Sequence, residues 1–432
     1  MRVASVQMAT WRRTYQWIAN PYVFLEDARK KHGLTFWMDL AMVGRVLVTG
    51  DPDLVGRIVD HPDLESGRGI AVLRAILGNG SLITLDGENH GHRRRTLAPS
   101  LNRGLERFDL ETARYTIEQL GNLRPGSEVS VYELVRKVTL QTIVGLIFGV
   151  HDRDQRRHVE RLVEAFLRSC TSSWLLYVRP LHVDLGPLTP WGRARRQGDR
   201  LRQFITGHIR AARRSPVEPA SGILAELSRS ADLTEEDLTA EILALLLFGH
   251  DTSAATLAWA FAHVCGHPGT MARIRSAGQP FLDACLHESM RLNPVVVHVT
   301  RVARRDVDLG PHRVPSGTRV FASSYLAGRN ENVFPEPSLF RPERFLNDVS
   351  ESRALFPFGL GARTCIGRHL AMRQMALIMS TMIRHADIEL APGYEIRPVR
   401  RTVLMVPKAG TRVVIGKCLE PRHPEYSSSP AA

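Results

Sequence analysis

The sequence predicts a mostly helical protein with small β regions, an α+β architecture in which helices form the larger part. Apolar residues recur at helical spacing through the middle of the chain, in segments 107–122, 130–149, 153–172, 194–214 and 236–264. Strand-like runs occur near the start and after residue 300, where glycine and proline separate short stretches rich in β-branched residues. The β regions therefore flank a helical body.

The first elements can be placed from turn and cap signals. Segments 34–40 and 44–50 predict two short strands around a glycine turn. Asp51 or Asp53 stands where it would cap the helix that follows. Later in the chain, the Pro- and Ser-containing segment 215–222 predicts a surface loop.

Beyond residue 300 the sequence pattern changes from helical spacing to strands and irregular segments. A β-hairpin pattern with turn residues at Gly310 and Ser316 is followed by the stretch 328–364, which is rich in Pro, Gly, Asn and Arg and has little periodicity. An irregular stretch of that length inside a compact protein usually has a function. A second hairpin is expected around Lys408 and Gly410.

At ~150 residues per domain, the 432 residues give a prior of about three domains, although large single-domain enzymes also reach this length. The last residues, 417–432, are expected to form a frayed tail. Apolar residues make up 44% and charged residues 23%, which excludes a wholly disordered chain. The most apolar stretch, 242–249, is far shorter than the ~20 residues that span a membrane, so no transmembrane segment is predicted.

Cysteine usage and charge narrow the possible environments. The five cysteines are scattered without a CxxC pair, which favours a reducing, cytoplasmic location. The net charge of +13 comes from dispersed arginines, and the densest runs, 93–95 and 210–214, lack interleaved aromatic residues. We therefore predict no nucleic-acid partner; an acidic protein or an anionic ligand fits the charge at least as well.

One segment carries a specific chemical pattern around Cys365. Phe358, Gly361, Arg363 and Gly367 surround this cysteine at fixed spacing, and a helical pattern starts directly afterwards. A sulfur at a helix N-terminus beside an arginine is biased toward the thiolate, which is a metal ligand. For a lone cysteine the plainer interpretation is an ordinary buried thiol near a turn.

This signature resembles the haem-binding loop of the cytochrome P450 family, in its soluble bacterial form. The resemblance implies a single domain over 1–432 with a core of about 20–416. It also implies the fold of that family, with a long central helix over the haem, and heme b (iron protoporphyrin IX) as the cofactor. It assigns Cys365 as the ligand of the metal. Phe358, Gly361, Arg363 and Gly367 become cofactor-binding residues on the same basis.

A second family motif lies upstream. Glu288 and Arg291 are three residues apart on one predicted helix face, and Arg344 follows 53 residues later in the sequence FRPERF. Taken alone, the first two residues are an exposed ion pair of little energetic value. The resemblance implies instead a buried network of all three side chains that braces the loop carrying Cys365, a structural and not a catalytic role.

The third motif is an acid beside a hydroxyl, Asp251 and Thr252, inside a long apolar helix. Either residue is also a plausible N-cap of a helix that starts there. By resemblance the pair is catalytic, bending the central helix and delivering protons for oxygen activation. Phe248 and Gly249 are placed by the resemblance in the substrate pocket. Because the family usually has a small residue where Phe248 stands, we expect a constricted or unusually oriented pocket.

Haem carries two propionates that need cationic partners. His90 and Arg94 are four residues apart on one helix face, as in similar pairs of bacterial members, and His92 is an alternative to His90. Arg301 and Arg363 occupy positions from which the family supplies further contacts. Without this context each of these arginines would be taken as a solvated surface charge.

The implied function is haem-thiolate monooxygenation, the insertion of one atom of O2 into a hydrophobic small molecule such as a natural product, a terpenoid or a fatty-acid-like compound. Electrons are expected from a separate ferredoxin or flavodoxin with its reductase, and the protein is expected to be a monomer. Candidate docking residues for this acidic partner are Arg93, Arg95, Arg368 and Arg373. Segments 70–83, 166–177 and 295–299 are expected to line the substrate pocket.

Two other classes of function remain open from the sequence. One is a peroxygenase or a non-oxidative haem-thiolate isomerase or dehydratase; the intact pair of Asp251 and Thr252 argues for the reductive route instead. The other is a haem-based sensor or ligand carrier that binds apolar ligands without turnover.

Overall fold

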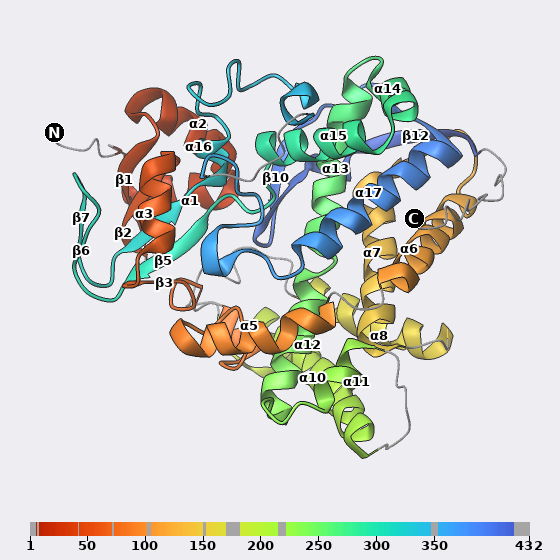
Figure 1. Cartoon of the computed structure of the whole chain (residues 1–432), viewed down its shortest axis with the longest axis horizontal. Helices are drawn as coiled ribbons and strands as arrows, with labels where there is room; N and C mark the ends of the chain where they lie inside the picture. Colours follow the sequence, from red (N-terminus) through yellow and green to blue (C-terminus); the bar gives the residue numbers. More distant parts are fainter. Residues whose placement is uncertain are drawn as a thin grey trace, which may run out of the picture.

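The computed structural model describes residues 6, 8–41, 43–70, 73–101, 105–149, 153–169, 182–214, 222–346 and 353–418. Most of this chain is helical, and the strands form small sheets beside the helical body (Figure 1). The predicted architecture is therefore confirmed. The predicted loop at 215–222, except Gly222, and the predicted tail after residue 418 lie outside the described residues.

One group of helices packs around the main hydrophobic core. Its buried side chains include Val138, Phe261, Leu286 and Met379, which come from four different helices. The helices are α6 (Leu105–Gly121), α7 (Val131–Phe148), α13 (Asp251–Gly266), α15 (Gln279–Leu292) and α17 (Arg368–His385).

A second group packs around a core of its own. On its longest helix, Leu201, Ile205 and Ile209 recur every four residues and are fully buried, so the amphipathic spacing decides which face turns inward. The helices are α5 (Gly87–Leu101), α8 (Arg153–Ser169), α10 (Pro190–Arg214), α11 (Ile223–Ser228) and α12 (Glu235–Phe248). In Figure 1 they form the lower part of the molecule.

A sheet with the strand order β1-β2-β8-β5-β3 lies to one side of the helices (Figure 1). Its strands are β1 (Thr35–Leu40), β2 (Gly44–Thr49), β3 (Leu64–Glu65), β5 (Val299–Ala303) and β8 (Arg319–Ala322). The nearby helices are α1 (Thr10–Ala19), α2 (Pro21–His32) and α3 (Pro52–Asp60). As predicted, Asp51 caps α3, where its side chain accepts a hydrogen bond from Leu54 N at 2.9 Å.

The C-terminal strands correct one prediction. The hairpin forms between β10 (Pro398–Arg401) and β11 (Leu404–Pro407), whereas residues 408–410 make a single turn that leads into β12 (Arg412–Cys418). Strand β12 pairs with β4 (Ser127–Ser130) and β9 (Ala386–Leu390). The side chains of Val413 and Ile415 on β12 are buried in the main core. This burial favours pairing of β12 with β4 and β9 over a hairpin across the turn at 408–410.

Shorter elements complete the described chain: α4 (Arg74–Leu77), α14 (Thr270–Ala277), α16 (Ser324–Ala327), β6 (Val307–Asp308), β7 (Arg313–Val314) and the 3-10 turns Gly186–Leu188, Pro342–Phe345, Gly361–Arg363 and Lys408–Gly410. Within the described residues, the stretch Glu235–Gly266 is long and apolar enough to cross a membrane, but it lies mostly buried in the protein, as a core helix does.

A buried ion pair joins α5 and α12 in the second group of helices. The Glu241 carboxylate on α12 accepts hydrogen bonds from Leu82 N at 2.6 Å and from Arg93 Nη1 at 2.9 Å. Arg93 also pairs with Asp237 at 2.8 Å and is buried. The prediction that Arg93 serves an acidic partner is therefore wrong, because two carboxylates inside the protein already neutralise it.

This burial predicts a pH-dependent stability. Burial raises the pKa of Glu241 to about 7, so the folded protein holds this proton more tightly than the unfolded chain does. The resulting stabilisation is fully present below about pH 4.5 and is lost as the pH rises through about 7, a change of about 3 kcal/mol. Urea unfolding should show Glu241→Gln gaining stability relative to the wild type from about pH 5 to about pH 8; parallel curves would contradict the assignment.

Candidate active site

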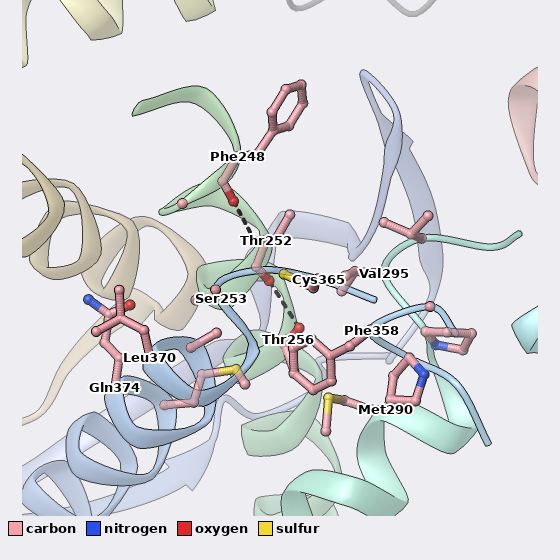
Figure 2. A pocket seen from close by; sticks show the side chains of 18 of the residues that line it. Phe248, Thr252, Ser253, Thr256, Met290, Val295, Phe358, Cys365, Leu370 and Gln374 are labelled. Atoms are coloured by element: carbon pink, nitrogen blue, oxygen red, sulfur yellow. Dashed lines mark hydrogen bonds between the residues drawn. The ribbon is translucent and has the colours of Figure 1, made fainter. Parts of the chain in front are cut away.

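A cavity of about 340 Å³ lies between the junction of α12 and α13 and the loop that carries Cys365 (Figure 2). Its size is in the range of small-molecule sites. Cys365 and Thr252 both line it, and most of the other lining side chains are apolar. They include Leu101, Phe108, Ile143, Phe248, Met290, Val295, Val299, Phe358 and Leu370.

The Cys365 loop is held by backbone hydrogen bonds. Cys365 N donates to Phe358 O at 2.8 Å, and Arg94 Nη1 on α5 donates to Thr364 O at 2.6 Å. Gly361 adopts φ +63°, and a Cβ there would lie 2.8 Å from a Val59 methyl group, so the turn requires glycine. The loop ends at Gly367, the N-cap of α17, which places the Cys365 sulfur near the positive end of a helix.

The irregular stretch before this loop is anchored by a buried ion pair. Arg291 Nε lies 2.6 Å from Glu288 Oε2, and both side chains are fully buried. Arg344 Nε lies 3.4 Å from Glu288 Oε1, so the structure brings the three predicted residues together. Arg291 Nη1 also donates to the carbonyl oxygens of Gly328 and Pro337, at 2.6 and 2.8 Å. These bonds fix the segment 328–341; bracing of the Cys365 loop itself stays a prediction.

Four predicted propionate-binding residues converge in one place. Arg363 pairs with Asp86 at 2.5 Å and Arg301 Nη1 donates to Ser66 Oγ at 3.2 Å. Burial and the charges of Arg363 and Arg94 lower the pKa of His90 to about 4. Burial, and then Arg363, lowers the pKa of Arg301 to about 10.

This cluster fits an anionic group. The charges that act on His90 are those of Arg363, Arg94 and Arg301 and of one carboxylate, Asp86, which pairs with Arg363, so the cluster carries surplus positive charge in a largely buried place. A buried surplus of charge is costly unless a ligand of opposite charge completes it. Two haem propionates would do so, and the adjacent thiol of Cys365 would meet the iron. The residues present therefore fit haem.

The central helix breaks between α12 and α13, at Gly249 and His250. Thr252 Oγ1 donates to Phe248 O at 2.8 Å, and Thr139 Oγ1 donates to His250 O at 3.1 Å. Side-chain hydroxyl groups therefore form hydrogen bonds to backbone carbonyl groups around the break. Neither Asp251 nor Thr252 is the N-cap, a position that belongs to His250, so the capping interpretation is excluded.

The two residues predicted to deliver protons, Asp251 and Thr252, point in different directions. Thr252 lines the cavity together with Ser253 and Thr256. Asp251 turns toward α7, where its Oδ1 accepts a short hydrogen bond from the Tyr132 hydroxyl. Tyr132 was not found from the sequence, because no local pattern connects two residues 119 positions apart.

Phe248 lies on the cavity wall, as expected, and Figure 2 shows its ring directed away from Cys365. A constriction of the pocket by this ring stays a prediction. Gly249 also lines the cavity, and a Cβ there would lie 2.4 Å from Leu245 O, which the backbone does not tolerate.

Of the three segments predicted to line the pocket, one does so. Val295, Val296 and Val299 line the cavity, but in the described parts of 70–83 and 166–177 the apolar side chains of Leu73, Ile76, Ile83 and Phe166 pack in or against the second core. Residues 71, 72 and 170–177 lie outside the described residues. The described residues of these two segments are not among those that line the cavity, so lining of the pocket by these two segments stays a prediction.

The other candidate docking residues differ in availability. Arg95 is exposed and Arg368 is half-buried. Arg373 is exposed but already forms a bidentate ion pair with Asp109. Of the four arginines expected at an acidic partner, Arg95 is thus the most accessible.

The fold and the cavity define a helical protein with a thiol and a buried cation cluster at one apolar site. The family model of cytochrome P450 matches residues 8–414. The chain therefore belongs to the cytochrome P450 family, whose members are haem-dependent monooxygenases that use O2 and a redox partner.

Individual relatives agree with this assignment. The chain is 28% identical to cytochrome P450 137 of Mycobacterium tuberculosis over 397 residues, 89% of this chain and 83% of the relative. It is 29% identical to cytochrome P450 138 of Mycobacterium bovis over 401 residues, 89% of this chain and 90% of the relative.

Solved structures share the fold. The haem domain of cytochrome P450DA superposes with a TM-score of 0.82 at 18% identity, covering 96% of this chain and 97% of that one. Retinoic-acid-bound CYP120A1, from a cyanobacterium, gives 0.79 at 24% identity, covering 93% and 95%.

The buried ion pair gives a prediction for stability. Arg291→Ala leaves the Glu288 carboxylate buried without its partner, which should cost about 3–5 kcal/mol of unfolding free energy. The matched control is Arg313→Ala, which breaks a surface pair with Asp306 at 3.1 Å and should change little. Urea unfolding followed by circular dichroism compares the two; equal losses would show that burial does not set the cost.

Proposed function

We propose that this protein inserts one oxygen atom from O2 into a hydrophobic small molecule, with heme b bound between Cys365 and the central helix. The observation that carries this proposal is one apolar cavity with the Cys365 thiol and the Thr252 hydroxyl both on its walls. A thiol donor, a hydroxyl for proton transfer and apolar walls are the groups that this reaction needs.

The cofactor would be held at two ends. The Cys365 thiolate would ligate the iron, and His90, Arg94, Arg301 and Arg363 would bind the propionates. Phe358, Gly361 and Gly367 shape the loop that presents the sulfur. When bound, the haem supplies the oxygen activation and the oxygen transfer. The protein contributes the ligand, the electrostatic environment and the exclusion of water.

The walls select the substrate. Met290, Val295, Val299 and Leu370 offer apolar contacts, so binding favours a largely apolar molecule of terpenoid or fatty-acid-like character. The structural neighbour that binds retinoic acid makes this elongated apolar acid a sensible probe, together with lauric acid and indole.

Protons reach the cavity along the central helix. The Thr252 hydroxyl donates its own hydrogen to Phe248 O, which leaves its oxygen lone pairs to accept a hydrogen bond inside the cavity. It can thereby position a water molecule in the cavity. The acid next to it, Asp251, would resupply the proton from outside the cavity.

Electrons would come from a separate ferredoxin or flavodoxin, attracted by positive surface charge such as that of Arg95. We place the protein in the cytoplasm as a monomer. A sensor or carrier would bind the three probes without forming product, and a peroxygenase or isomerase would act without reductant. Product formation that requires O2, NADPH, a ferredoxin and its reductase distinguishes the proposal from both.

The relay gives a direct test. Thr252→Ala should leave probe binding unchanged and divert reducing equivalents to hydrogen peroxide, because the hydroxyl that positions the proton is gone; a loss of about tenfold or more in coupled turnover is expected. Ser253→Ala, which removes a hydroxyl from the neighbouring position on the cavity wall, is the control. Product and peroxide are measured per NADPH. Unchanged coupling in Thr252→Ala would remove the threonine from the mechanism.

A further inference from the structure

Asp251 lies at the inner end of a row of charged side chains. The Tyr132 hydroxyl donates to Asp251, and the Arg401 guanidinium lies over the Tyr132 ring, 4.8 Å from its centroid. Arg401 Nη1 pairs with Glu133 at 2.8 Å. Glu133 lies 3.3 Å from Arg136 Nε, and Arg136 lies 3.7 Å from Glu164. We call Tyr132, Glu133, Arg136, Glu164 and Arg401 the polar seam.

The polar seam leads from the buried helix break to solvent. Tyr132 is buried, whereas the side chains of Glu133 and Arg401 are 47% and 35% exposed. The polar seam comes from α7, α8 and β10, and Tyr132 is not among the residues that line the cavity. Asp251 is therefore connected to solvent, while its neighbour Thr252 is connected to the cavity.

We propose that Tyr132 is a positioning residue for proton supply: it holds the Asp251 carboxylate at the polar seam, where the carboxylate takes up a proton from solvent for transfer to the Thr252 side. This inference rests on the proposed function. In each transfer one proton binds to a carboxylate oxygen and one leaves it toward the cavity, so Asp251 returns to its starting form and no electrons are exchanged; one turnover needs two such transfers.

Tyr132 itself acts as a donor and not as an acid. Burial, and then the charge of Asp251, raises the pKa of Tyr132 well above its usual value, so the phenol stays protonated. Its hydroxyl can orient the carboxylate, and the positive charge of Arg401 sits on the other side of its ring. In a purely structural role, Tyr132 would only pack α7 against α13. Experiments can distinguish this structural role from the positioning role.

The chain offers a closely matched control. Tyr115 on α6 is equally buried, its hydroxyl accepts a hydrogen bond from Arg114 at 2.9 Å, and Arg114 and Arg156 lie over its ring at 4.7 and 5.0 Å. Tyr132→Phe and Tyr115→Phe each remove one hydroxyl from a buried ring under an arginine. Only the first removes a bond to Asp251.

With the best-converted of the three probes and a ferredoxin as electron donor, Tyr132→Phe should lower kcat about tenfold with KM within about twofold, the pattern of a lost interaction in the reaction step. The solvent kinetic isotope effect on kcat should rise and more NADPH should end as peroxide. Tyr115→Phe should change none of these. A crystal structure of Tyr132→Phe, with or without haem, should show Asp251 turned from its wild-type orientation toward α7.

The outcomes separate this inference from the proposed function. If Thr252→Ala uncouples turnover but the two tyrosine variants behave alike, the role of Tyr132 is overturned and the relay stands. If Thr252→Ala has no effect, the relay itself fails. An unmoved Asp251 in the Tyr132→Phe structure also overturns the inference, even without turnover of any probe. Should Tyr132→Phe not fold, Arg401→Gln removes the outer charge of the polar seam and should raise the same isotope effect.

Discussion

The placement of one sulfur atom governs the rest of the site. Cys365 ends an irregular loop whose backbone is fixed by its own hydrogen bond to Phe358 and by the guanidinium of Arg94, and a helix begins directly after it. The apolar walls and the break in the central helix lie around the same cavity as this sulfur (Figure 2).

Electrostatics divides the molecule into two kinds of buried charge. Arg93 on α5 contacts Glu241 and Asp237 on α12, and Arg291 and Arg344 both contact Glu288 on α15, so each of these cations meets a buried carboxylate. Around His90, in the described part of the chain, Arg94, Arg301 and Arg363 lie with one carboxylate, that of Asp86, which pairs with Arg363. The first contacts are explained by folding alone, whereas this excess of positive charge is explained by an anionic ligand. This contrast is the physical reason to place haem here and not at the other buried charges.

Local sequence patterns predicted much of the fold, but contacts between residues far apart in the sequence could not be predicted from them. The spacing of Leu201, Ile205 and Ile209 was enough to predict α10, and the motif around Cys365 was enough to find the site. The pairing of β12 was missed because it depends on strands far away in sequence. The burial of Arg93 was missed for the same reason, since Glu241 lies 148 positions away. The contact between Tyr132 and Asp251 likewise exists only in the folded chain.

The absorption spectrum of the reduced, carbon-monoxide-bound protein reconstituted with haem tests the central claim most directly, because the position of its main band reports which protein side chain ligates the iron. The account predicts the long-wavelength band of a thiolate-ligated haem, and its loss when Cys365 is replaced by histidine. A band at the shorter wavelength of histidine-ligated globins in the wild-type protein would contradict it.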